Sequence, residues 1–345
     1  MEGSTTSSIL TKSIEGPVAW RGDALAHARD WAVYMPQASL EEIDRALGRF
    51  RDSARPLETM RREDFEIPTL APLLRDVANE LENGRGFVQV KGLPVDRYSL
   101  RDAEIAYWGL GRHLGDALSQ NARGELLGHV RDEGLDVRNT SVRGYQTNAG
   151  QSFHTDIGGD VLGLMCLKGA MIGGASRLAS SMTIYNELLR RYPWYVALLY
   201  KNFDIDWRGE QLTGSPAVYR EPIFSYFEER LSCRFAPRFI RSAPEKTGIP
   251  LSPVELDVLR IMEELAEELC FEIPFDPGDI QFINNYVIVH GRTAYQDHPD
   301  DARKRHLLRL WLKVPGARKL PPAYGEGRAR HGVPPRAERK EETHA

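Results

Sequence analysis

The sequence predicts a mainly β protein, a sandwich or barrel of short strands with helices packed around it. Many short apolar segments of strand length are separated by Gly and Pro, which is typical of such folds. No GxGxxG or GxxxxGK[ST] motif follows a predicted strand, and these motifs mark the phosphate-binding loops of parallel α/β sheets. The two observations disfavour a parallel sheet of alternating strands and helices.

Helices are predicted from capping residues and apolar spacing, and they cover residues 39–50, 70–81, 99–118 and 252–269. Ser39 and Glu42 form the pattern of a capping box at the first, and Gly84 follows the second as a stop signal. Pro253 takes the first position of the last helix. The apolar residues of that helix predict packing against a sheet: Val254, Val258, Ile261, Met262, Leu265 and Leu269.

Strands are predicted over residues 86–91, 161–167, 279–283, 287–290 and 305–314. In the last strand, alternation places Arg305, Leu307, Arg309 and Trp311 on one face and His306 with three leucines on the other. Two positively charged arginines in an otherwise apolar strand need anionic partners. A carboxylate suits a guanidinium group, which binds it through two N–H groups. That partner is either an acidic ligand or an internal Asp or Glu.

Composition places the chain among ordinary globular proteins. It has 345 residues, of which 41% are hydrophobic and 27% are charged, which excludes collagen, coiled coil and wholesale disorder. No internal repeat or long linker divides it, so we expect a single domain over residues 14–316, with helices in the N-terminal part. The polar ends, residues 1–13 and 325–345, are predicted to be disordered.

Charge and cysteine content narrow the possible partners and the compartment. Forty-five basic and 49 acidic residues give a net charge of −4, so nucleic acid is not an expected partner. The cysteines Cys166, Cys233 and Cys270 show no CxxC spacing and are predicted to be core thiols. There is no apolar run of about 18 residues and no signal-peptide pattern, so we expect a cytoplasmic protein with no membrane segment.

A His-x-Asp motif carries the strongest indication of chemistry. His154 and Asp156 are two residues apart, so in an extended segment their side chains project from the same face. A second histidine from another strand would complete a 2-His-1-carboxylate triad, which leaves coordination positions of Fe(II) open. Chance alone supplies about one such tripeptide in this composition. The second match, His298 with Asp300, lies in a polar run with Pro299 and is predicted to be a surface loop.

His290 is the candidate for the distal histidine. It ends the apolar run Tyr-Val-Ile-Val-His and is followed by Gly291 and Arg292. A histidine that closes an apolar strand is often only a satisfied core residue. The neighbouring motif around Asp279 and the arginine-bearing strand favour the role of a metal ligand.

Together these segments resemble the Fe(II)/2-oxoglutarate dioxygenases of the taurine and chlorophenoxyacetate (TauD/TfdA) family. The resemblance rests on Phe-His154-Thr-Asp156, Gly173-Gly-Ala-Ser176, Pro-Gly-Asp279, His290-Gly-Arg292 and the strand with Arg305 and Arg309. Their order also fits, and the likeness extends over residues 86–314. It implies a double-stranded β-helix, that is, a cupin-like jelly roll with flanking helices.

The resemblance also implies roles for individual residues. His154, Asp156 and His290 would bind Fe(II) and form the catalytic centre. Arg305 would bind the far carboxylate of 2-oxoglutarate, and Ser176 falls at the position of a threonine that touches the same cosubstrate.

Residues around the substrate are less closely matched. Arg309 falls where the taurine enzyme holds the sulfonate, so it would bind a substrate acid or brace 2-oxoglutarate. Tyr145, Gln146 and Asn148 precede the first ligand and are either substrate donors or surface-loop residues. Their segment differs from the taurine enzyme's substrate loop, which disfavours taurine itself.

The implied activity is oxidation of a small molecule, with O2 and 2-oxoglutarate as cosubstrates and succinate and CO2 as co-products (EC 1.14.11.-). Hydroxylation of an amino acid, a small acid or a natural-product intermediate is the first expectation. Desaturation or cyclisation would use the same ligands. A metalloenzyme that does not use 2-oxoglutarate and a non-catalytic cupin-type binding protein are the remaining alternatives.

Overall fold

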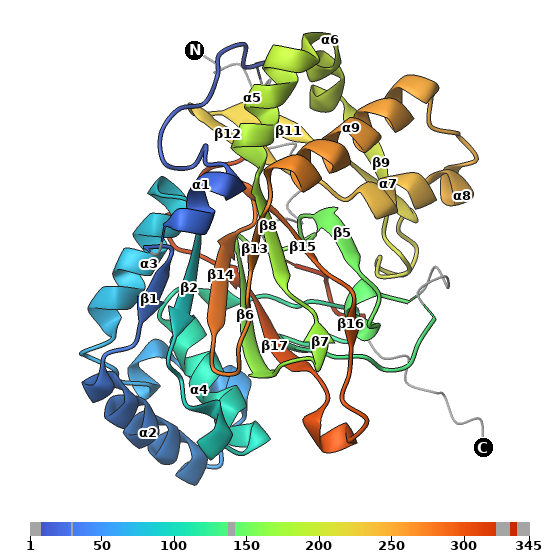
Figure 1. The fold of residues 1–345 in the computed structure, drawn as a ribbon. Coiled ribbons are helices and arrows are strands. Elements are labelled where there is room, and N and C mark those ends of the chain that lie inside the picture. Colours follow the sequence, from blue (N-terminus) through green and yellow to red (C-terminus); the bar gives the residue numbers. More distant parts are fainter. Residues whose placement is uncertain (1–7, 29, 137–141, 322–331, 337–345) are drawn as a thin grey trace, which may run out of the picture.

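A larger and a smaller antiparallel β-sheet form the centre of the protein, and the computed structural model describes residues 8–28, 30–136, 142–321 and 332–336 (Figure 1). The larger sheet contains, in spatial order, β1 (Ala32–Tyr34), β2 (Phe87–Lys91), β14 (Ile280–Asn284), β6 (Val161–Lys168), β17 (His306–Lys313) and β3 (Asp116–Ala117), and β4 (Leu127–Val130) also pairs with β17. Within this sheet, only the β1–β2 pair is parallel among the described strands. The smaller sheet contains β13 (Phe271–Ile273), β8 (Ser176–Ser180), β15 (Ile288–Arg292) and β5 (Gln151–His154).

Successive strands alternate between these two sheets. The chain passes from β5 in the smaller sheet to β6 in the larger one and back to β8, and later from β14 to β15 to β17. This alternation is the connectivity of a double-stranded β-helix. The predicted fold class, a mainly β jelly roll with flanking helices, is therefore confirmed.

Shorter elements surround the two sheets. The remaining strand pairs are β7 (Ile172–Gly173) with β16 (Tyr295–Gln296), β9 (Asn202–Asp206) with β10 (Val218–Pro222), and β11 (Phe224–Phe227) with β12 (Arg230–Cys233). The α-helices are α1 (Gly22–His27), α2 (Gln37–Asp52), α3 (Ala71–Asn83), α4 (Leu100–Arg112), α5 (Ser181–Arg191), α6 (Pro193–Val196), α7 (Pro237–Ser242), α8 (Pro244–Thr247) and α9 (Pro253–Leu269). Single 3-10 turns lie at Leu57–Thr59, Arg62–Asp64, Val95–Arg97, Gly144–Gln146, Ala197–Tyr200 and Asp301–Arg303.

Strand β17 separates the two main apolar clusters, as its alternation predicts. Its residues Leu308, Leu310 and Leu312 pack with buried side chains of α2, α3 and α4, which cover the outer face of the larger sheet. Trp311, on the opposite face, packs with buried residues of the smaller sheet and of α5 and α9. The inner face of β17 is thereby directed at the space between the sheets.

Two predicted helix boundaries are wrong for local reasons. Helix α2 begins at Gln37 after Pro36, so Ser39 is a buried residue inside the helix and not its cap. Helix α4 begins at its Ser99 cap as predicted but ends at Arg112. A side chain at Gly115 would lie 2.4 Å from the Lys313 carbonyl oxygen, where the chain turns to pair with β17 as β3.

The last helix follows its prediction more closely. Helix α9 spans Pro253–Leu269, and Ser252 and Glu255 form its capping box. Most of its predicted apolar face is buried, but Val254 is 52% exposed because it lies in the first turn, before the helix reaches the sheet. Within the described residues, no helix has the length and apolar composition needed to cross a membrane.

Part of each end that the sequence predicts to be disordered is packed on the protein. The Leu10 amide donates to the Tyr200 hydroxyl at 3.1 Å. Val333 is buried, and its amide donates to the Ser119 carbonyl oxygen at 2.8 Å. Hydrogen bonds to the rest of the protein thus hold segments whose composition alone indicates disorder. Residues 1–7, 322–331 and 337–345 lie outside the described residues. Of the cysteines, Cys166 and Cys233 are core thiols as predicted, but Cys270 is only half-buried.

We predict that Leu308→Ala lowers the free energy of unfolding by about 2–5 kcal/mol, because it removes a fully buried side chain between the larger sheet and its helices. Leu256→Ala on α9 is the matched control, since Leu256 is 45% exposed, and it should change stability by less than about 1 kcal/mol. Urea denaturation followed by circular dichroism measures both. Equal effects in the two variants would contradict the packing described for β17.

Candidate metal centre

Antiparallel pairing of β5 with β15 brings two histidines together. His154 ends β5, and it lies directly opposite His290 in the ladder. The centroids of the two imidazole rings are 4.3 Å apart. One ligand atom from each ring and one carboxylate oxygen of Asp156 lie within 4.8 Å of one another. The predicted triad is therefore assembled from residues that are 136 positions apart in sequence.

The backbone at Asp156 is held by the turn between β14 and β15. The Asn285 side chain accepts from the Asp156 amide at 2.9 Å and donates to the Asp156 carbonyl oxygen at 2.9 Å. The same amide group donates to the carbonyl oxygens of Gly158 and Gly159. Arg234 also donates to the Asp156 carbonyl oxygen. Asn285 thus fixes the residue that follows β5 relative to the strand that carries His290.

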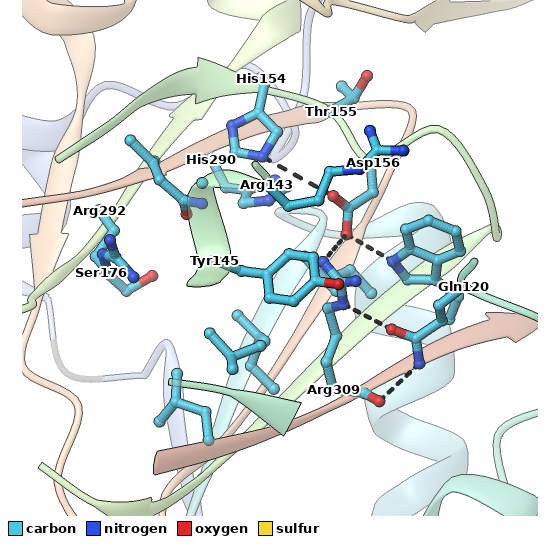
Figure 2. A pocket seen from close by; sticks show the side chains of 18 of the residues that line it. Gln120, Arg143, Tyr145, His154, Thr155, Asp156, Ser176, His290, Arg292 and Arg309 are labelled. Carbon is cyan, nitrogen blue, oxygen red and sulfur yellow. Dashed lines mark hydrogen bonds and ion pairs between the residues drawn. The ribbon is translucent and has the colours of Figure 1, made fainter. Parts of the chain in front are cut away.

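The two oxygens of the Asp156 carboxylate have different surroundings (Figure 2). Oδ1 lies 3.9 Å from His154 Nε2 and faces the triad. Oδ2 accepts a hydrogen bond from the Trp311 indole at 2.6 Å and lies 3.9 Å from Arg309 Nη1. One oxygen is therefore directed to a ligand position while the other is held from behind.

Protonation of the triad suits a divalent metal. Burial, followed by the neighbouring His154, lowers the pKa of His290 to about 3, so this ring is neutral at physiological pH. Burial by itself would raise the pKa of Asp156, but Arg309, both histidines and the Trp311 N–H together hold it below its ordinary value. His154 Nδ1 lies 2.8 Å from the Ser152 carbonyl oxygen, which favours a proton on Nδ1 and leaves the lone pair of Nε2 available to bind a metal. A neutral His290 imidazole and an ionised Asp156 carboxylate fit Fe(II).

Arg305 and Ser176 line the same cavity as the triad. Arg305 is 4% exposed, and its Nη1 has no hydrogen-bond partner among the described residues. Its guanidinium packs over Gly174, where a Cβ would lie 3.0 Å from Nε, so a side chain at position 174 would crowd this contact. The Ser176 hydroxyl donates to Gln281 Oε1 at 2.6 Å. Both predicted cosubstrate residues therefore line the cavity, and Arg305 has an unused donor there.

Arg309 is fixed between two aromatic rings. Its guanidinium carbon lies 4.6 Å from the Tyr145 ring centroid and 5.0 Å from that of Trp311. Its Nε donates to Gln120 Oε1 at 2.7 Å, and the Gln120 amide donates to the Arg309 carbonyl oxygen at 2.9 Å (Figure 2). Arg309 is thus oriented toward Asp156 before any ligand arrives.

The structure separates the three candidate substrate residues. Tyr145 lines the cavity, but Gln146 and Asn148 do not. The Gln146 side chain accepts from the Arg143 amide and donates to Glu133, because it closes the 3-10 turn Gly144–Gln146. Asn148 is exposed. Of the two alternatives given for these residues, this arrangement favours the surface loop for Gln146 and Asn148.

The alternative His-x-Asp motif is a surface loop, as predicted. Asp300 accepts from the Ala302 amide at 2.9 Å and caps the short turn Asp301–Arg303. His298 accepts from the Asp300 amide at 3.1 Å. Both side chains accept hydrogen bonds within their own turn, and neither residue lines the cavity.

Sequence reasoning missed Trp311, Gln120 and Asn285 as parts of the centre. The alternation of β17 does place Trp311 on the face of Arg305 and Arg309, which is the one signal that could have found it. Nothing local indicates Gln120, whose contacts reach 189 residues along the chain.

Comparison with known proteins decides the family. Residues 53–311 match the family described as "Taurine catabolism dioxygenase TauD, TfdA family". The chain belongs to the TauD, TfdA family. It is therefore related to the non-haem Fe(II)/2-oxoglutarate dioxygenases, as the sequence motifs indicate. The two imidazoles and the carboxylate of the triad are ligands that fit the iron of these enzymes.

Individual relatives agree with this membership. The chain is similar to the "FR-33289 synthase" of Streptomyces rubellomurinus (strain ATCC 31215), with 33% identity over 91% of this chain and 94% of the relative. It is also similar to the "Taurine hydroxylase-like protein SAT17" of Stachybotrys chartarum (strain CBS 109288 / IBT 7711), with 29% identity over 90% of this chain and 84% of the relative.

Solved structures share the fold. An asparagine oxygenase, determined with Fe(II), 2S,3S-3-hydroxyasparagine and succinate, covers 89% of this chain and 99% of its own, with 18% identity and a TM-score of 0.65. The non-heme iron oxygenase OrfP, determined with Fe and alpha-ketoglutaric acid, covers 82% of this chain and 94% of its own, with 14% identity and a TM-score of 0.61.

We predict that Trp311→Phe weakens metal binding about 10- to 100-fold, because it keeps the ring but removes the N–H that holds Asp156 Oδ2. Calorimetric titration with Mn(II) as a stable substitute for Fe(II) measures the dissociation constant. Trp108→Phe is the matched control, since Trp108 is buried but its indole nitrogen donates no hydrogen bond within the described part of the chain. Equal affinities for the Trp311 variant and the unmodified protein would refute the supporting role of the indole.

Proposed function

We propose that this protein is an Fe(II)/2-oxoglutarate-dependent dioxygenase (EC 1.14.11.-) that hydroxylates an acidic small molecule, with succinate and CO2 as co-products. The observation that carries the proposal is a single cavity lined by the triad and by the buried, partly unpaired Arg305. A metal centre alone would fit several jelly-roll activities. An unpaired guanidinium beside it supports use of a 2-oxo acid with a second carboxylate.

In this proposal each end of the cavity has its own task. His154, Asp156 and His290 hold iron, which when bound supplies the redox chemistry with O2 and 2-oxoglutarate. Arg305 and Ser176 bind the far carboxylate of 2-oxoglutarate. Trp311 and Arg309 hold the outer oxygen of Asp156, so that the other oxygen keeps its direction.

Charge favours an acidic substrate. The described residues that line the cavity include Arg143, Arg292, Arg305 and Arg309, against the carboxylates of Asp156 and Glu210. The two negative charges of 2-oxoglutarate offset the two positive charges of iron, which leaves an excess of arginine. We assign the substrate acid to the region of Arg309 and Tyr145, at the Asp156 end of the cavity.

The relatives support a small, functionalised substrate. One similar structure was determined with a hydroxylated asparagine, and the curated relatives are named as a synthase and as a taurine hydroxylase-like protein. An amino acid, a small acid or an acidic natural-product intermediate fits this set. Desaturation or cyclisation of such a substrate would need the same residues.

We expect anaerobic addition of Fe(II) and 2-oxoglutarate to produce a weak visible charge-transfer absorption, and addition of O2 with a panel of amino acids and small acids to release succinate. Asp156→Ala should abolish both signals, because it removes the carboxylate ligand. Asp300→Ala is the matched control and should retain both, since Asp300 only caps a surface turn. Loss of the signals in the Asp300 variant alone would show that the other His-x-Asp motif binds the metal.

A second test concerns the substrate acid. For any substrate found in the panel, Arg309→Gln should raise KM at least 10-fold, because the arginine is the proposed partner of its acid group. The dissociation constant of 2-oxoglutarate should change by less than about threefold. The opposite pattern, with weak 2-oxoglutarate binding and an unchanged KM, would assign Arg309 to the cosubstrate.

A further inference from the structure

Arg292 is a buried cation whose donors are only partly used. It lies two residues after His290 on β15, directly opposite Ser176 of β8 in the antiparallel ladder. The side chain is nearly fully buried, and its Nη2 donates to the carbonyl oxygens of Thr147 and Ala149. Nε and Nη1 have no hydrogen-bond partner among the described residues. Such unpaired, buried N–H groups carry a large desolvation cost and indicate a missing acceptor.

A second buried arginine lies beside it. The guanidinium carbons of Arg292 and Arg305 lie 4.7 Å and 5.0 Å from the centroid of the same Tyr295 ring. Neither guanidinium forms an ion pair with an Asp or Glu in the described part of the chain. The two buried like charges beside this ring repel each other. An anion bound between the two arginines would relieve both the repulsion and the unpaired donors.

Both arginines and Ser176 line the cavity that contains the metal triad. Figure 2 shows Arg292 and Ser176 together at the end of the cavity away from Asp156. A carboxylate has two oxygens and about four lone-pair directions, so one group can accept from Arg305 Nη1 and from the unpaired N–H groups of Arg292 together. The far carboxylate of the cosubstrate is the anion that the proposed function supplies at this end.

We propose that Arg292 is a second arginine for the far carboxylate of 2-oxoglutarate and that, through Nη2, it couples cosubstrate binding to the segment 144–150. This inference rests on the proposed function. The segment carries Tyr145, which stacks on Arg309, and its Asn148 carbonyl oxygen accepts from the Tyr295 amide at 3.1 Å. A carboxylate bound to Arg292 fixes this side chain. Through the bonds of Nη2 it thereby fixes the segment 144–150, which carries Tyr145.

Calorimetry on the Mn(II)-loaded protein tests the first part. Arg292→Gln should weaken 2-oxoglutarate binding at least 10-fold. It should change pyruvate binding by less than twofold, because pyruvate has the same 2-oxo acid group but no far carboxylate. Arg292→Lys keeps a charge and should show an intermediate loss. Arg177→Gln is the matched control, since Arg177 lies next to Ser176 on β8 but pairs with Glu267 outside the cavity, and it should bind both acids as the unmodified protein does.

Amide hydrogen exchange tests the coupling. Addition of 2-oxoglutarate to the Mn(II)-loaded protein should slow exchange over residues 144–150, and this protection should be lost in Arg292→Gln and Arg292→Lys. Near-normal 2-oxoglutarate affinity in a cooperatively folded Arg292→Gln variant, or equal losses for both acids, would overturn the proposal. Failure of the unmodified protein to bind 2-oxoglutarate would instead refute the proposed function itself.

Discussion

Antiparallel pairing of β5 with β15 is the constraint on which the metal centre depends. It sets His154 opposite His290, and a shift of one residue in register would turn one imidazole to the other face of the sheet. Asn285 extends this constraint to Asp156, because its side-chain amide binds the backbone on both sides of that residue. The three ligands are therefore placed by sheet hydrogen bonds and one turn, and the metal does not have to gather them.

The arginines at the two ends of the cavity differ in how far their N–H groups are paired. At one end, Arg309 is oriented by Gln120, by two aromatic rings and by the outer oxygen of Asp156. At the other end, Arg292 and Arg305 are buried with unpaired N–H groups. An arginine held in place in this way supports a ligand residue and can face a substrate acid, whereas buried arginines that lack acceptors favour the binding of an anion between them. The same residue type thus serves two purposes within one cavity.

The candidate residues that the structure brings together are those with a periodic or spacing constraint. The two-residue step from His154 to Asp156 and the alternation along β17 both follow from extended geometry, which is independent of the rest of the fold. Neither Gln146 nor Asn148 lines the cavity, because nearness in sequence to a metal ligand does not set the direction of a side chain. The Gln146 side chain accepts a hydrogen bond from the Arg143 amide within its own 3-10 turn, so its oxygen is occupied by a local backbone group.

The sequence by itself determined the donor set, the strand periodicity and the family, because these depend on residue identity and local spacing. Only the tertiary structure decided which His-x-Asp motif meets a second histidine, that Trp311 holds the outer oxygen of Asp156, and that Arg292 lies beside Arg305. Each of these contacts joins residues from different strands or a strand and a distant loop. Their geometry is set by sheet register and by the burial of side chains between the sheets, which no local pattern encodes.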